Sequence, residues 1–521
     1  MRLYSCPVPP GPSEQLLPQH KAASPRSLLA LCAALLGMLV VWLLIFPWSG
    51  EGDAVTHYLH ARAALANPAY AMSAFDRPVH KLLLFLPAQG GLICARIWMA
   101  LVSTICIWQT VRLAEDLGLR NSLLAAPLLL FQPYTFALAS DTMTELPMAL
   151  LIVIAIRLWL HNRLVLSCVV MSFSPAARPE GAFLIPLWGI LMLLRRDFGT
   201  FTRRLLRSTT LAIGMLCWWL LGIIFTRDPL FLIHAWFWPA NSAETAGHGE
   251  LLHYVHNWRE YCGPILIYPF YIGFACAVLA TVFPFVASSR RRFASAPSCL
   301  PSVALPIAVW LIVFTLHSFL WWRGMFGSLG LLRWIVPTAP LTAIFCLCGL
   351  NLIADLLRLV RIAAPIRATL AILTIALAAT NAILFSASGP YRYHGFAIRR
   401  CVAYILDNHL LESAPALLLG DAIAYAELPG PQKLDTASNA WDRKSQLAIV
   451  RRMPPGSIAL WDDQQAQMWH CITIEDLQSQ GFRILYDDRS LAPSFPCQFD
   501  FRPLRYWPLR YAVLRKDRQV P

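Results

Sequence analysis

Residues 28–47 read LLALCAALLGMLVVWLLIFP, twenty consecutive residues without a charge, and this stretch determines the class of fold. A helix needs about 20 apolar residues to cross a bilayer core of about 30 Å. The whole chain continues the pattern, because 57% of its 521 residues are hydrophobic and only 14% are charged. Ordinary soluble domains carry about 25% charged residues. The composition therefore excludes a cytosolic enzyme, a disordered chain and a small disulfide scaffold, and it leaves an integral membrane protein.

The charges are unevenly distributed along the chain. Residues 1–389 hold 27 Lys and Arg against 15 Asp and Glu, whereas residues 390–521 hold 16 against 14. The first part is apolar with basic loops, and the second part has the composition of a soluble domain. We therefore predict a cytoplasmic N-terminal tail, a transmembrane domain and a C-terminal extra-cytoplasmic domain at 1–27, 28–388 and 389–521.

The C-terminal region alternates short apolar stretches with helix-like segments. Such alternation is typical of a small α/β domain. Strands are expected at 416–419, 457–461 and 482–486, and helices at 398–411 and 474–479.

We expect about eleven membrane segments. Nine are continuous apolar runs, and two are short helices joined by a polar elbow, because two prolines and two charges would otherwise lie in lipid. The expected segments are 28–47, 91–111, 122–139, 144–160, 164–173, 182–194, 207–225, 264–287, 303–321, 333–354 and 367–387.

The short basic loops give the orientation. Cytoplasmic loops carry an excess of Lys and Arg. With eleven segments, the loops around Arg195, Arg290 and Arg358 all lie on the same side as Lys21 and Arg26. We therefore expect the N-terminus in the cytoplasm and the C-terminal domain outside, in a bacterial inner membrane or an endoplasmic reticulum membrane.

The first external loop, residues 48–90, contains an apolar stretch that is too short to span. We expect there a helix lying on the membrane surface, with Arg77, His80 and Lys81 facing lipid head groups. We expect no nucleic-acid partner despite the net charge of +14. The excess of basic residues lies in the short loops expected in the cytoplasm, where Lys and Arg normally collect.

Carboxylates begin two external segments. Glu51 and Asp53 follow the first span, with His57 four residues further on, and Asp141 and Glu145 precede the span at 144–160. One interpretation is helix capping, since acidic residues are favoured in the first turn of a helix. The other is catalysis, because a carboxylate beside the bilayer can deprotonate an acceptor hydroxyl next to a lipid-borne substrate.

Two further places carry unusual charges. Arg178 and Glu180 lie at the polar elbow, where they either pair with each other or bind a ligand. Arg323 and Arg333 flank a loop with three glycines, and arginine forks suit phosphate. The alternative for these two arginines is contact with lipid head groups.

No cysteine and histidine cluster has the spacing of a metal site. His248, His253 and His256 share one loop, and such residues are more often solvated than bound to zinc. We expect no cofactor and no bound metal, and we leave a divalent ion open.

With these acidic sites, this elbow and this arginine loop in order along the sequence, the chain resembles the GT-C superfamily of membrane glycosyltransferases. Members have an acidic residue or pair in the first external loop, here Glu51 and Asp53, and commonly a second acidic site, here Asp141 or Glu145. An Arg-Pro-Glu-Gly turn between short helices is frequent, here starting at Arg178.

A late span of the family often opens with Gly-x-x-Arg-aromatic-x-x-Pro, which matches residues 330–337. The resemblance covers residues 28–388. It departs from the family in the first loop, where Glu-Gly-Asp stands in place of Asp-Glu, so which carboxylate acts as base stays open.

The resemblance implies an enzyme that transfers a sugar, mannose or another hexose, from a polyprenyl-phosphate donor to a glycan, lipid or protein acceptor. Inversion is the family expectation. Asp53 or Glu51 would be the base, and Arg333, Arg323 and Arg178 would bind the donor phosphate. The remaining substrate-binding candidates are Asp141, Glu145, Glu180 and His57. The alternatives are a transporter or flippase of lipid-linked saccharides, and a structural assembly subunit.

Overall fold

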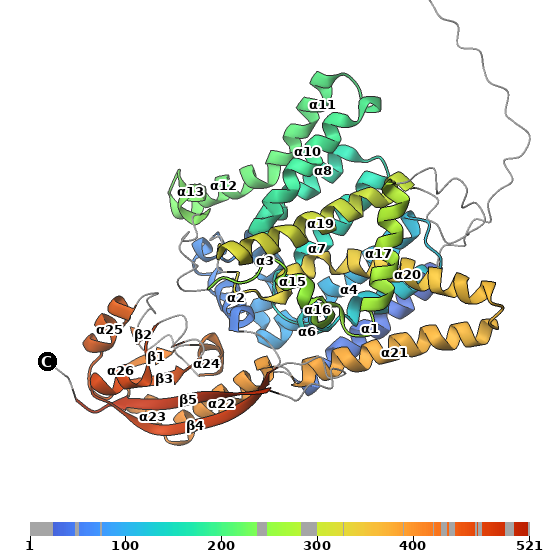
Figure 1. Cartoon of the computed structure of the whole chain (residues 1–521). Coiled ribbons are helices and arrows are strands. Elements are labelled where there is room, and N and C mark those ends of the chain that lie inside the picture. The colour runs from blue at the N-terminus through green and yellow to red at the C-terminus, as the bar shows by residue number, and fades with distance from the viewer. Residues whose placement is uncertain are drawn as a thin grey trace, which may run out of the picture.

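The computed structural model describes most of the chain, and helices dominate it as far as residue 407 (Figure 1). The described residues are 24–46, 52–72, 75–236, 247–282, 300–326, 328–388, 390–419, 421–428, 435–436, 443–463, 466, 471–494 and 505–518. Glu51 lies outside these residues.

Six described helices are long and apolar enough to cross a membrane. They support an integral membrane protein. Their bounds are Pro25–Ile45 (α1), Leu92–Asp116 (α4), Phe201–Thr226 (α11, η6 and α12), Val303–Arg323 (within α19, Leu300–Arg323), Leu332–Leu359 (η8, Leu332–Thr338, and α20, Ala339–Leu359) and Ala364–Ala387 (within α21, Ala364–Ser388).

Shorter helices fill the space between these long ones. The segment 122–139 is broken in three, because Pro127 lies within it and Pro133 begins a new helix. The elbow expected at 174–181 is present, with short helices on either side. The shorter elements of this part are η3 (Ser122–Leu124), α5 (Ala125–Leu130), α6 (Pro133–Leu138), α7 (Glu145–Leu160), α8 (Leu164–Ser172), α9 (Ser174–Ala177), η4 (Pro179–Leu184), α10 (Ile185–Leu194), η5 (Arg196–Phe198), α11 (Phe201–Ser208), η6 (Thr209–Ala212), α12 (Ile213–Thr226) and α17 (Ile267–Val282).

The loops expected outside the membrane carry short helices of their own. The first loop contains α2 (Gly52–Ala63), η1 (Pro68–Ala71), α3 (Pro78–Leu84) and η2 (Pro87–Gly90). The second contains α13 (Phe231–Trp236), α15 (His253–His256) and α16 (Trp258–Cys262).

The C-terminal part contains a five-stranded sheet with the order β2-β1-β3-β5-β4. β1 is parallel to β2 and β3, whereas β5 is antiparallel to β3 and β4. The strands are β1 (Ala416–Leu419), β2 (Asp435–Thr436), β3 (Ile458–Asp462), β4 (Phe482–Ser494) and β5 (Arg505–Lys516). The helices are α22 (Pro390–Asp407), α23 (Leu410–Ser413), α24 (Ala422–Glu427), α25 (Arg443–Arg452) and α26 (Ile474–Ser479).

The sheet is covered on both faces, because successive side chains of a strand point to opposite sides. Leu417 and Leu419 pack in one apolar cluster with residues of α22 and α24. Ala416 and Leu418 pack in the other, with residues of α25 and α26.

The first external helix joins the two parts of the protein. Val55 of α2 belongs to the same apolar cluster as Ile398, Leu417 and Ile423, and Leu59 packs against that cluster. The C-terminal part is therefore held against the helix whose first turn carries Asp53, and this contact positions the site.

Candidate functional site

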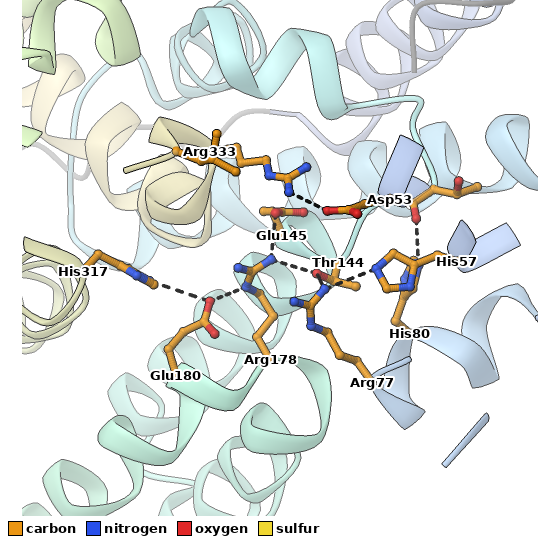
Figure 2. Close-up of polar contacts among 12 residues, drawn as sticks. Asp53, His57, Arg77, His80, Thr144, Glu145, Arg178, Glu180, His317 and Arg333 are labelled. Carbon is orange, nitrogen blue, oxygen red and sulfur yellow. Dashed lines mark hydrogen bonds and ion pairs between the residues drawn. The ribbon is translucent and has the colours of Figure 1, made fainter. Parts of the chain in front are cut away.

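The carboxylates and arginines of four distant segments meet in one polar cluster (Figure 2). α2 supplies Asp53 from its first turn, α7 begins at Glu145, the elbow supplies Arg178 and Glu180, and η8 supplies Arg333. These residues are up to 280 positions apart in the sequence. Their convergence makes the cluster the strongest candidate for a functional site.

Asp53 and Arg333 form an ion pair at the open side of the cluster. Arg333 donates from a terminal nitrogen to Asp53 Oδ2 at 2.7 Å. The Asp53 side chain keeps 46% of its surface exposed, whereas Arg333 keeps 8%. A second molecule can therefore reach the carboxylate while the guanidinium stays recessed.

The surroundings of Asp53 change its acidity. Although part of its side chain is exposed, loss of water around the carboxylate inside the cluster raises the pKa of Asp53 to about 6; Arg77 opposes this rise and Glu145 adds to it. A carboxyl group with a pKa near the working pH is suited to general base catalysis, because it is ionised and still basic enough to accept a proton.

Arg178 is the buried centre of the cluster. It pairs with Glu145 at 2.7 Å and with Glu180, and it donates to the hydroxyl of Thr144 at 2.8 Å. Its guanidinium lies 5.5 Å from the ring centroid of Trp334. Of the two interpretations that the sequence offered for these residues, the pairing of Arg178 with Glu180 is present, and Glu145 is a second carboxylate partner. A buried arginine needs such partners.

The elbow that carries Arg178 depends on a glycine. A Cβ at Gly181 would lie 2.4 Å from the carbonyl carbon of Ser174, too close for any side chain. Ser174 also donates its hydroxyl to the carbonyl of Gly181 at 3.1 Å. The Arg-Pro-Glu-Gly turn is thus a compact backbone crossing that directs Arg178 and Glu180 inward.

The prediction that the charges of this helix face lipid head groups is wrong. His80 and Lys81 of α3 are buried inside the protein. Lys81 pairs with Asp76 at 3.0 Å and donates to the carbonyl of His57 at 2.5 Å. Burial lowers the pKa of Lys81 to about 8, against the effect of Asp76. The charges of α3 turn inward because acidic and carbonyl partners lie on that side.

Arg77 is a site residue that the sequence reasoning missed. It donates to the Thr144 hydroxyl at 2.9 Å, so that two arginines share one hydroxyl, and it lies 3.2 Å from His57 Nε2. Its φ of 56° is rare for a residue with a side chain, and such strain often marks functional sites. His57 is buried and stacks on Phe75 with ring centroids 4.8 Å apart.

The other sequence candidates lie apart from this cluster. Asp141 is buried and lies 3.9 Å from Arg96 of α4, where burial raises its pKa to about 6. Arg323 is exposed at the end of α19, beside the ring of Trp322 at 5.5 Å.

His317 of α19 is a second residue that was missed. It is buried, lies 3.7 Å from Glu180 and makes an edge contact with Trp334. A histidine inside a long apolar run was the available signal. Among the described residues, no group of three or more His, Cys, Asp or Glu is placed to hold a metal ion.

Comparisons with known proteins identify the fold. No family model matches the sequence, and no curated protein matches it significantly. The structure is similar to that of ArnT from Cupriavidus metallidurans bound to undecaprenyl phosphate, with a TM-score of 0.53 and 14% identity over 94% of this chain and 98% of that one. The arabinofuranosyltransferase AftD from Mycobacteria aligns with a TM-score of 0.45 and 14% identity, over 96% of this chain and 40% of that one. The chain therefore shares the overall fold of ArnT over nearly its whole length.

Proposed function

We propose that the protein is an integral membrane glycosyltransferase that moves a hexose, with mannose as the first candidate, from a polyprenyl-phosphate donor to an acceptor on the extra-cytoplasmic side. The observation that carries the proposal is the Asp53–Arg333 pair at 2.7 Å. In this pair a carboxylate with a raised pKa lies beside a recessed guanidinium; we infer that the carboxylate acts as the base and that the guanidinium binds the phosphate. The ArnT fold supports the donor class, since ArnT was solved with undecaprenyl phosphate.

The donor phosphate would bind at Arg333, with Arg178 behind it. Arg178 is already held by two carboxylates, so Arg333 is the arginine that can exchange its partner most readily. Arg323 is exposed at the end of a long helix and would attract the donor head group before it enters. In this arrangement the guanidinium groups would neutralise the charge of the phosphate.

The ion pair couples donor binding to activation of the base. When the phosphate takes the Arg333 guanidinium, Asp53 loses its cationic partner and becomes a stronger base. Asp53 then takes the proton of the acceptor hydroxyl while that oxygen attacks the anomeric carbon. The bond from the anomeric carbon to the phosphate oxygen breaks, and polyprenyl phosphate leaves with the electron pair. Attack opposite the leaving group inverts the anomeric centre.

An apolar cavity beside the elbow would hold the polyprenyl chain. It measures about 750 Å³ and its polar lining is small. Its lining includes Pro175 and Ala182, which precede and follow Arg178 in the sequence, together with Gly189 and Ala212. The chain would thus extend along α10 while its phosphate reaches the polar cluster.

The C-terminal part would form the acceptor side of the site. Its cluster of apolar residues includes Val55, two residues after Asp53. An acceptor that reaches the exposed carboxylate therefore approaches next to α24.

The proposal is tested by transfer of radiolabel from polyprenyl-phosphate-mannose in membranes that contain the wild-type protein, with total membrane extract as acceptor. Label above that of membranes without the protein supports the enzyme and the sugar. If a panel of polyprenyl-phosphate sugars gives no label with folded protein, the transporter or flippase alternative replaces the proposal.

The transfer rate is expected to rise with pH and to level off above about 6. The pKa of Asp53 is raised to about 6, so the base is protonated and inactive below this pH and ionised above it. The pH profile of kcat/KM measures this dependence. The variant Asp141→Asn removes another carboxyl whose pKa is about 6. Loss of the pH dependence in that variant would assign it to Asp141 instead.

Filling the apolar cavity is expected to weaken binding of long donors alone. The Gly189→Trp variant would raise the KM for a long polyprenyl donor about tenfold. This is the effect expected when the indole displaces about two CH₂ groups of the chain, each of which contributes about 0.8 kcal/mol when buried. The KM for a short citronellyl-phosphate donor would not change. The neighbouring variant Ile190→Trp, at an exposed position outside the cavity, is the matched control. Equal effects on both donors would place the chain elsewhere.

A further inference from the structure

A segment of the second external loop contacts the backbone around Arg333. This segment, residues 249–262, is called the strap here, and it contains α15 and α16. His253 Nε2 lies 2.8 Å from the carbonyl of Gly330, and the hydroxyl of Tyr254 donates to the carbonyl of Leu331 at 3.3 Å. Tyr261 donates to the carbonyl of Ile335 at 3.2 Å. Three side chains of the strap thus bind the main chain on both sides of Arg333.

The hydrogen bonds of His253 fix which ring nitrogen carries the proton. The side-chain nitrogen of Asn257 donates to the carbonyl of His253 at 2.9 Å and lies 3.2 Å from its Nδ1. An amide nitrogen can only donate, so Nδ1 of the imidazole must accept. The proton therefore sits on Nε2, which donates it to the Gly330 carbonyl.

The turn that His253 contacts has a left-handed backbone, which is strained at Leu329 and unstrained at Gly330. Gly330 has a φ of 63° and Leu329 has a φ of 51°, both in the left-handed region. A side chain in this region costs about 1–3 kcal/mol and persists only where the surroundings hold it. His253 and Trp321 lie directly against Gly330, since an added Cβ there would be 3.0 Å from His253 Nε2 and 2.9 Å from Trp321. The strap therefore packs directly against this turn and binds its carbonyl.

The turn leads directly into η8, which presents Arg333. The side chain of Arg333 is buried up to its tip and ends at Asp53, so its direction follows from the direction of the backbone at its base. Trp334, the next residue, is packed against His317 and Arg178. A shift of the turn would move both residues relative to the polar cluster.

We propose that His253 is a positioning residue, which through the carbonyl of Gly330 sets the turn before η8 so that Arg333 meets the donor phosphate. The strap thus forms part of the phosphate-binding apparatus without contacting the phosphate. This inference rests on the proposed function, because it takes Arg333 as the phosphate ligand. It differs from the sequence interpretation of His253, which was a solvated or zinc-bound histidine.

The test is binding of undecaprenyl phosphate to the purified full-length protein, measured by native mass spectrometry. The His253→Ala variant is expected to bind about three- to tenfold more weakly, which is the effect of one lost hydrogen bond. The His253→Gln variant keeps a donor at a similar reach and is expected to restore most of the affinity. The His256→Ala variant is the matched control, since His256 lies on the same strap but its exposed imidazole pairs with Glu250, at 3.3 Å.

A double variant separates positioning from general damage. In an Arg333→Ala background, His253→Ala is expected to cause no further loss of binding, because the residue acts through Arg333. Additive losses, or an equal loss in His256→Ala, would overturn the positioning role. If Arg333→Ala weakens binding and His253→Ala does not, the positioning role of His253 is wrong while the phosphate site at Arg333 stands. If Arg333→Ala binds as the wild type does, the phosphate site of the proposed function fails.

Discussion

Replacement of Asp53 by Asn is expected to lower the transfer rate by about a hundredfold to ten-thousandfold, the usual contribution of a positioned general base. Asn has the shape of Asp and still accepts a hydrogen bond from Arg333 with its oxygen, but it cannot take a proton from the acceptor. The loss should therefore appear in kcat, with a smaller change in the KM for the donor. Initial rates of radiolabel transfer measure both quantities.

The controls for this variant use two other carboxylates of the chain. Asp197→Asn removes an exposed acid that pairs with Arg195, on the side expected to be cytoplasmic, and it should transfer at the wild-type rate. Glu51→Gln tests the other carboxylate of the first loop, and we expect a rate close to that of the wild type. A folded Asp53→Asn protein with full activity would contradict the role of Asp53, and a large loss in Glu51→Gln would transfer the role to Glu51.

The sequence could predict the residues that break a local pattern. Charged residues in an apolar chain stand out, so Asp53, Glu145, Arg178, Glu180 and Arg333 were all identifiable from the sequence, and the structure brings them into one cluster. The elbow was equally visible, because prolines and charges together cannot lie in lipid. Each of these features is a charged residue or a proline within an apolar stretch, so it is visible in the local sequence.

The residues that the sequence reasoning missed or misplaced belong to a segment with an ordinary pattern. Arg77, His80 and Lys81 fit a helix on the membrane surface, and only the tertiary contacts with Thr142, Thr144 and Asp76 show that they point inward. Strand β5 was missed for a similar reason, since Pro508 interrupts it in the sequence while pairing with β4 supports it in the fold. Partners far away in the chain, such as Thr142 and Thr144, decide most such contacts, and a single sequence does not reveal them.

Loss of Arg178 is expected to destabilise the folded protein by about 3–5 kcal/mol, the usual effect of removing one partner of a buried ion pair. The Arg178→Met variant keeps the length of the side chain but leaves Glu145 and Glu180 buried without their cation. Thermal unfolding of the purified protein in detergent measures the loss. Arg157→Met is the matched control, because the pair of Arg157 with Asp116 is more exposed than that of Arg178 and its removal should destabilise the protein less.

A triple variant distinguishes the structural part of Arg178 from its part in catalysis. Arg178→Met combined with Glu145→Gln and Glu180→Gln removes the unpaired charges, so most of the stability is expected to return, since uncharged replacements of a buried ion pair are often tolerated. Transfer is expected to stay low, because the second guanidinium for the donor phosphate is still absent. Recovery of both stability and transfer would show that Arg178 only maintains the fold, and would leave Arg333 as the remaining buried arginine proposed to bind the donor.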